Sequence, residues 1–146
     1  MITIAKRQNG LIRANDKVYS IEEIHQLFRQ WKKEYWDILQ TQPRKLQRVQ
    51  VVFDGVPIKV YSQRYELFLQ NTKCAVCGLE ANCYLLERAE KSKRYHFNLY
   101  YQDEKGNFTL FTKDHILPKS KGGKNWLSNY QTMCYPCNFE KGNTVN

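Results

Sequence analysis

Long apolar runs and acidic residues are scarce in this sequence of 146 residues. No stretch approaches the roughly 18 apolar residues of a membrane-spanning helix, and residues 1–10 lack the apolar core of a signal peptide. Asp and Glu number 14 against 23 Lys and Arg, which gives a formal net charge of +9. We therefore expect no membrane association and a polyanionic partner, because a cation beside a phosphate releases condensed counterions.

Cysteine occurs in a pattern that indicates a metal site. Four of the five cysteines form two Cys-x-x-Cys pairs, Cys74 with Cys77 and Cys134 with Cys137. A two-residue spacer lets both sulfurs of a pair reach one ion, and four thiolates complete the tetrahedral shell of Zn²⁺. In the reduced, cytosolic setting expected here, paired cysteines more often hold metal than form disulfides. The sequence therefore predicts a structural zinc site, and Cys83 is left as a small buried side chain.

A helix is expected from about residue 21 to residue 39. Ser20 can cap its first turn, with Glu23 in the third position of a capping box, and apolar residues then recur at helical spacing. The opposite face of this helix is basic and carries Arg29, Lys32 and Lys33. That face is either solvated or in contact with phosphates.

Two β-rich runs, 49–53 and 56–61, flank the sequence Asp54-Gly55, which suits a tight turn and predicts a β-hairpin. A short helical run is expected around residues 65–69, before the first cysteine pair. We therefore expect residues 1–72 to form a helix and β-hairpin region. It either supports the remainder of the chain or contacts the polyanionic partner.

The segment between the cysteine pairs predicts a strand meander. Residues 84–86, 95–101 and 108–111 are rich in aromatic and aliphatic side chains, and a turn at 103–107 joins the last two runs. This meander is an insertion within a zinc-stapled region that we expect to span residues 73–146.

Candidate catalytic residues lie close to the second cysteine pair. Asp114 and His115 end an expected strand, in which adjacent side chains point to opposite faces and can have different roles. Asn138 lies in the first turn of a helix that Pro136 can open and Gly142 can close. Carboxylate and amide oxygens are hard donors suited to Mg²⁺ or another divalent ion. An isolated Asp-His pair is usually a surface feature, but a zinc with four thiolates has no open position, so any chemistry must occur at such a second site.

These motifs together resemble the HNH nuclease family, the ββα-metal endonucleases. The resemblance rests on Cys74-Ala75-Val76-Cys77, Asp114-His115-Ile116-Leu117-Pro118-Lys119-Ser120, Gly122-Gly123, Asn129, Cys134-Tyr135-Pro136-Cys137-Asn138 and Lys141-Gly142. It implies that His115 is the general base and that Asp114 and Asn138 bind the catalytic divalent ion. It also implies that Asn129 fixes the loop carrying His115. Asn138 stands where many members have histidine, so the chain looks like an asparagine-type variant.

The expected fold is α+β, with a ββα-metal core stapled by a four-cysteine zinc, an inserted β meander and an N-terminal helix and β-hairpin. The expected function is a metal-dependent endonuclease that hydrolyses DNA phosphodiester bonds in the cytoplasm of a bacterium or a phage-infected bacterial host. Residues 1–72 are then a support or DNA-docking region. Lysines expected to neutralise phosphates are Lys119, Lys121, Lys124 and Lys141.

Double-stranded DNA is the expected substrate, and a homodimer would permit double-strand cleavage because each chain has one site. The main alternative is a non-catalytic zinc ribbon that binds nucleic acid, and a further one is a structural interaction module. The presence of a base beside two oxygen ligands favours the enzyme.

Overall fold

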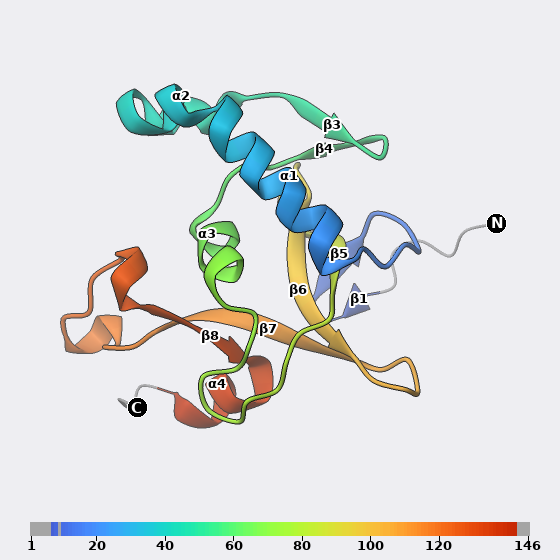
Figure 1. Ribbon diagram of the computed structural model, residues 1–146, viewed down its shortest axis with the longest axis vertical. Coiled ribbons are helices and arrows are strands. Elements are labelled where there is room, and N and C mark those ends of the chain that lie inside the picture. The colour runs from blue at the N-terminus through green and yellow to red at the C-terminus, as the bar shows by residue number, and fades with distance from the viewer. Residues whose placement is uncertain (1–6, 9, 143–146) are drawn as a thin grey trace. The chain divides into compact units, whose positions relative to one another are not determined.

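A computed structural model describes residues 7–8 and 10–142 of the chain. Residues 1–6, 9 and 143–146 lie outside the described part, and with them the outer ends of the expected regions 1–72 and 73–146. Helices and strands are mixed, as the α+β expectation requires (Figure 1). The residues cluster into a first unit, Met1–Ser62 with Tyr84–Asn98, and a second unit, Gln63–Cys83 with Leu99–Asn146. A domain boundary at residue 73 stays a prediction.

The helices and strands have the following bounds. The elements of the first unit are β1 (Arg7–Gln8), β2 (Leu11–Arg13), α1 (Ile21–Glu34), α2 (Trp36–Thr41), the 3-10 helix η1 (Pro43–Arg48), β3 (Val51–Phe53) and β4 (Val56–Ile58). Those of the second unit are α3 (Gln63–Gln70), β7 (Phe108–His115), the 3-10 helices η2 (Lys119–Lys121) and η3 (Leu127–Asn129), β8 (Tyr130–Cys134) and α4 (Tyr135–Lys141). Both units receive residues from β5 (Cys83–Ala89) and β6 (His96–Gln102). No helix in the described ranges combines the length and the apolar character needed to cross a membrane.

Helix α1 starts where the sequence predicts and ends earlier. Ser20 Oγ accepts a hydrogen bond from Glu23 N at 3.1 Å, and Glu23 Oε1 accepts one from Ser20 N at 3.0 Å, so the capping box is complete. The prediction of one helix to residue 39 is wrong, because Tyr35 leaves helical geometry, with φ −106° and ψ 16°, and α2 begins afresh. Apolar spacing continues through Tyr35, so the pattern does not reveal this break.

The predicted hairpin is confirmed as β3 and β4, which pair antiparallel. Asp54 and Gly55 have φ values of 48° and 81°, the left-handed region that a two-residue turn of this kind requires. One carboxylate oxygen of Asp54 accepts hydrogen bonds from Tyr19 Oη at 2.7 Å and Lys17 Nζ at 3.1 Å. The turn residue is therefore held by the chain segment that leads into α1.

Aromatic rings fill the core of the first unit around Phe97, a fully buried residue of β6. Its ring centroid lies between 5.3 and 6.4 Å from the centroids of Tyr19, Phe28, Trp31, Phe53 and Tyr84. Most of these pairs are tilted toward the edge-to-face arrangement, which stabilises by about 0.5–1.5 kcal/mol beyond area burial. This cluster links α1, the β3–β4 hairpin and two strands of the unit.

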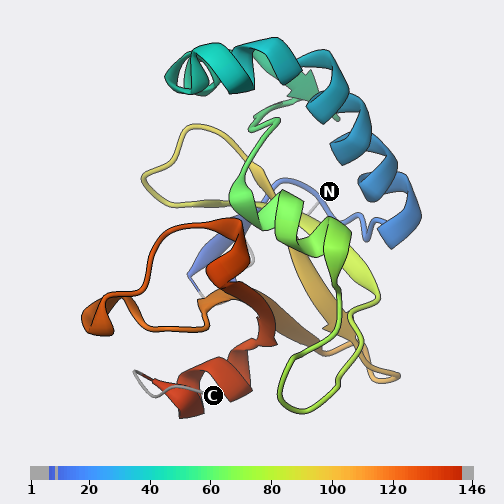
Figure 2. The same ribbon diagram turned by 60° about the vertical axis from the view of Figure 1, so that its left-hand side comes forward.

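The predicted meander is present, and in the second unit its strands lead directly to the candidate site. β7 pairs antiparallel with β6 (Tyr100↔Leu110) and with β8 (Asp114↔Gln131). Helix α4 follows β8 without a loop and packs on both β7 and β8 (Figures 1 and 2). The face of α4 that is turned to the strands can therefore reach side chains near the end of β7.

Candidate metal centre and active site

The four cysteines of the two predicted pairs converge, as the sequence predicts. The Sγ atoms of Cys74, Cys77, Cys134 and Cys137 all lie within 4.8 Å of one another, and those of Cys77 and Cys134 are 3.7 Å apart. A tetrahedral zinc with Zn–S bonds of about 2.3 Å places its sulfurs about 3.8 Å apart. The cluster therefore has the dimensions and the donor atoms to hold a metal ion such as zinc.

Backbone hydrogen bonds shape the turn that carries the first cysteine pair. Gly78 N donates to Cys74 O at 3.1 Å, and Val76 N lies 3.5 Å from Cys74 Sγ. Ala75 N donates to Thr132 O of β8 at 2.9 Å. The turn is thus fastened to the strand that delivers the second pair, so the two pairs are brought together by the backbone as well as by their sulfurs.

The thiols of the cluster differ in acidity. Burial raises the pKa of Cys74, but backbone N–H groups, those of Cys77 and Cys134 first, more than offset this and lower that pKa to about 6. Burial, followed by the neighbouring sulfurs, raises the pKa of the Cys137 thiol far above its ordinary range. Several thiolates at this spacing repel one another, so a bound cation is needed to bring the whole set to the ligating form.

Helix α4 presents two polar side chains to one face of β7. Asn138 and Lys141 are three residues apart and share a helix face, while Thr112 and Asp114 are two apart and share a strand face. Asn138 Nδ2 donates to Thr112 Oγ1 at 2.8 Å. Lys141 Nζ lies 3.1 Å from Asp114 Oδ2. The two expected ion ligands, Asp114 and Asn138, therefore belong to the same contact between β7 and α4, although no described hydrogen bond joins them.

The carboxylate of Asp114 is buried together with the ammonium group of Lys141. Their side chains are 10% and 3% exposed, and Asp114 Oδ2 also accepts a hydrogen bond from Gln131 Nε2 at 3.0 Å. Lys141 Nζ donates in addition to His115 O at 3.1 Å. An unpaired charge at such a position is strongly destabilising, so each group is needed to compensate the other. The expectation that Lys141 contacts phosphate gains no support from this burial.

The amide of Asn138 has a defined orientation. Thr112 Oγ1 donates its proton to Met133 O at 2.8 Å and so can only accept from Asn138 Nδ2. The nitrogen side of the amide therefore faces the strand. Its oxygen is the atom left for a cation, which is the donor type that Mg²⁺ prefers.

His115 projects from the opposite face of β7. Its Nε2 lies 2.8 Å from Asn125 Oδ1, and its ring meets that of Tyr130, its cross-strand partner, edge to face at 5.0 Å between centroids. An amide oxygen can only accept, so in this arrangement Nε2 carries the proton and Nδ1 has the basic lone pair. None of the described side-chain contacts joins His115 to Asp114 or Asn138, so the structure separates the imidazole from the β7–α4 contact.

Gln63 of α3 supports the His115 face of β7. Its Oε1 accepts hydrogen bonds from Tyr130 Oη at 2.9 Å and Lys113 Nζ at 3.4 Å, and its Nε2 donates to Asn125 O at 3.2 Å. Lys113 Nζ also lies 4.2 Å from the centroid of the Tyr130 ring. Burial, and secondarily the charge of Arg64, lowers the pKa of Lys113. This cluster fixes both residues that touch the imidazole.

Asn129 fastens the loop that follows His115. Its Oδ1 accepts a hydrogen bond from Leu117 N at 3.0 Å, and its Nδ2 donates to Leu117 O at 3.1 Å and Lys124 O at 2.8 Å. Glycine is required at position 123 of the same loop, because a Cβ there would lie 1.8 Å from Leu117 O. The side-chain amide thus joins both ends of the loop 117–124.

The remaining predicted site residues lie on this loop. Lys119, Lys121 and Lys124 are exposed. Sequence reasoning did not identify Asn125, Gln131, Thr112 or Gln63 as site residues. Gln131 could be found from the register of β7 against β8, since it pairs with Asp114. Asn125 and Gln63 meet the site only through tertiary packing and carry no motif signal.

A family comparison bears on the same segment. The model of a family described as HNH endonuclease matches residues 102–146, which include β7, β8 and α4. The resemblance based on the Asp-His, Asn and Cys-x-x-Cys-Asn motifs is confirmed by this match. No curated protein and no solved structure matches the chain.

Proposed function

We propose that this protein, whose residues 102–146 match the model of the HNH endonuclease family, is a metal-dependent endonuclease that hydrolyses phosphodiester bonds in double-stranded DNA. The family match supports a nuclease in general. The observation that carries the finer proposal is the convergence of Asp114, Asn138 and Lys141 where α4 packs on β7, beside the four-cysteine cluster that holds the start of α4. In this proposal β7, β8 and α4 form the ββα-metal core.

Asp114 and Asn138 would hold the catalytic divalent ion, Mg²⁺ or a similar cation. Their fit rests on the donor set: a carboxylate and an amide oxygen whose nitrogen is already committed to Thr112. When bound, the ion would neutralise charge that grows on the phosphate and the leaving 3′ oxygen. Zn²⁺ at the four cysteines would be structural, since four protein ligands leave no position for substrate.

His115 would act as the general base through Nδ1. The base accepts a proton from water while the water oxygen forms a bond to phosphorus and the bond from phosphorus to the 3′ oxygen breaks. The contacts of the ring with Asn125 and Tyr130 support this role, because they would hold the imidazole with its proton on Nε2. Asn129 would be a positioning residue, acting through the loop 117–124. Lys119, Lys121 and Lys124 would neutralise flanking phosphates.

Plasmid cleavage tests this assignment. Supercoiled plasmid is incubated with the full chain, loaded with zinc, in Mg²⁺ or Mn²⁺. Wild type is expected to nick the DNA, and His115→Ala is expected to lose cleavage by a factor of about 10² or more while keeping zinc content and DNA affinity. Asn125→Asp serves as a second variant, because it keeps an acceptor at Nε2 and should retain more activity than His115→Ala.

Equal cleavage by wild type and His115→Ala would remove the base assignment. Failure of wild type to cut any DNA or RNA substrate, with binding intact, would favour the zinc ribbon that only binds nucleic acid. Double-strand cleavage needs either a dimer or two successive cuts by single chains. Linear plasmid that forms without a preceding nicked form, and only at high protein concentration, would support the dimer.

A further inference from the structure

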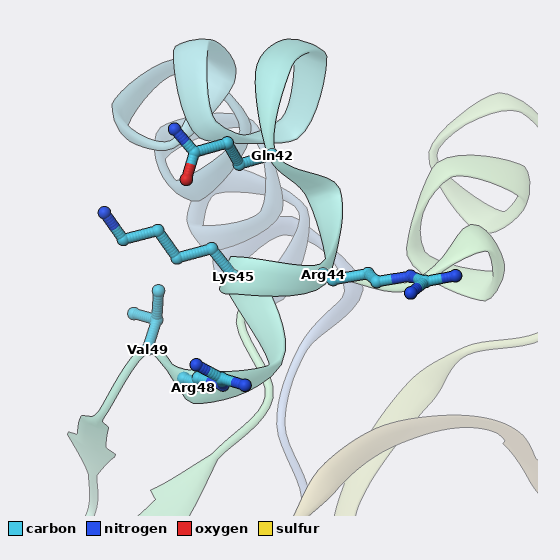
Figure 3. A pocket seen from close by; sticks show the side chains of 5 residues that line it. All are labelled: Gln42, Arg44, Lys45, Arg48 and Val49. Carbon is cyan, nitrogen blue, oxygen red and sulfur yellow. The ribbon is translucent and has the colours of Figure 1, made fainter.

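A basic hollow lies in the first unit, outside the segment that the family comparison matches. It has a volume of about 480 Å³ and is lined by Gln42, Arg44, Lys45, Arg48 and Val49 (Figure 3). Three of these five residues are cations, and none is acidic. All three cations belong to η1, a 3-10 helix of six residues.

The way η1 is anchored explains why its cations face solvent. Pro43 opens the helix with a φ angle already suited to it, and Leu46 is the one residue of η1 that is buried. With Leu46 turned inward, Arg44, Lys45 and Arg48 are exposed. Within the described part of the chain, these three side chains form no hydrogen bond or ion pair, in contrast to Lys17 with Asp54 and Lys141 with Asp114.

The directions of the side chains indicate what kind of anion would fit. Figure 3 shows Lys45 and Arg44 extending to opposite sides of η1, with Arg48 below them. One phosphate ion cannot be held by side chains that point apart. A polymer that carries a phosphate at each nucleotide can place successive charges beside the separate cations of η1, and each neutralised phosphate releases counterions.

We infer that η1 is an accessory docking surface for the phosphate backbone of a nucleic acid duplex. The identity of the polyanion rests on the proposed nuclease function, while the surface itself is defined by Arg44, Lys45 and Arg48. It contributes affinity without sequence information, since backbone contacts position a protein but do not read bases. The first unit then binds the same nucleic acid that the segment 102–146 cuts.

The experiment measures duplex binding by fluorescence anisotropy at several salt concentrations, with His115→Ala present in every protein so that DNA stays intact. The test variant carries Arg44→Ala, Lys45→Ala and Arg48→Ala. The matched control carries Lys91→Ala, Lys93→Ala and Lys105→Ala, which removes the same charge from three exposed turn residues. Circular dichroism and zinc content verify the fold of both.

The test variant is expected to bind the duplex roughly tenfold more weakly near 0.15 M salt. The slope of log affinity against log salt concentration is expected to become shallower by about 2 to 3, which is about 0.9 for each lost phosphate contact. The control is expected to change both quantities much less. Equal losses in the two variants would overturn the inference, because net charge alone would then explain them. The inference would also be overturned if a mononucleotide competed for binding as effectively as a duplex at the same phosphate concentration.

A plasmid assay of the same triple variants with His115 restored separates this inference from the proposed function. If the wild type cuts DNA and the test variant binds and cuts like the control, the docking surface is refuted and the nuclease proposal stands. Wild type that does not cut, with duplex binding still dependent on η1, would refute the nuclease alone.

Discussion

The two units of this chain are stabilised by different means. The first surrounds Phe97 with five aromatic rings and resembles an ordinary hydrophobic core. The second contains the four-cysteine cluster and the buried pair Asp114–Lys141. Apolar packing needs no metal ion, whereas thiolate ligation depends on the supply of one. The difference predicts that each unit fails under a treatment that leaves the other intact.

Metal removal is expected to have the largest effect on stability. This effect should be confined to the second unit. Structural zinc contributes on the order of 10 kcal/mol to small zinc domains. Chelation, or Cys77→Ser, should therefore abolish amide protection in residues 63–83 and 99–142. Protection should persist in residues 10–62 and 84–98, measured by hydrogen exchange and mass spectrometry. Cys83→Ala is the matched control, since Cys83 lies outside the cluster, and loss of protection in both units would contradict the comparison.

Truncation of the aromatic core should have the converse effect. Phe97→Ala removes the ring that contacts five others and is expected to cost about 3–5 kcal/mol, because the rigid neighbours cannot fill the cavity. Urea unfolding with hydrogen-exchange detection should show the loss in the first unit, while zinc content stays at one ion per chain. Phe108→Ala, at a half-buried position in β7 of the second unit, should cost less and leave the protection of the first unit unchanged. Zinc loss on Phe97→Ala would show that the two units do not fail separately.

Removal of the Asn129 side chain should weaken the loop 117–124 within the second unit. Asn129→Ala deletes three hydrogen bonds, each of which contributes about 1 kcal/mol, so a local loss of about 2–3 kcal/mol is expected. Exchange of the Leu117 amide should accelerate, and plasmid cleavage should fall more than tenfold with zinc content unchanged. Asn129→Asp, which keeps the acceptor for Leu117 N, should retain part of the protection. If Asn129→Ala kept an intact loop and full activity, the positioning role of Asn129 would be wrong.

Acidification provides the smallest effect and belongs to the first unit. Burial, followed by the charge of Arg29, lowers the pKa of His25 to about 4, below its usual 6.5. Between these values the unfolded chain binds a proton that the folded chain does not, so stability falls as pH drops from 6.5 toward 4. After a discount for partial solvation, about 1–2 kcal/mol should be lost. His25→Gln should show a smaller difference in urea midpoint between pH 7 and pH 5, and equal differences would contradict the assignment.

Local signals in the sequence predicted much of this architecture. The capping box at Ser20, the turn at Asp54 and the two cysteine pairs each depend on residues close together in the chain, and each is found as expected. The break at Tyr35 was not predictable, because it depends on where α1 stops packing on the core. The role of Asn125 was hidden for a similar reason, since only the folded loop brings it to His115.

The candidate site shows the same division between local and tertiary information. Motifs identified Asp114 and Asn138, whose spacing relative to the cysteines is encoded in sequence. They did not reveal that Lys141 is buried, because a lysine beside glycine at a helix end reads as a solvent-exposed cation. Asn138 and Lys141 are three residues apart and so share one face of a helix. The burial of Lys141 therefore follows once α4 is known to pack on β7.

The shared ammonium nitrogen of Lys141 restricts which basic residue can stand at this position. One tetrahedral nitrogen meets both the carboxylate of Asp114 and the backbone oxygen of His115, and the Lys141 side chain that carries it is 3% exposed. A guanidinium group is planar, larger and directs its donors in a fixed fork, so arginine would keep the charge and lose the fit. Replacement of Lys141 by arginine is thus a structural change inside the segment that matches the HNH endonuclease family, whereas the same exchange at the exposed lysines of the loop 117–124 changes only surface chemistry.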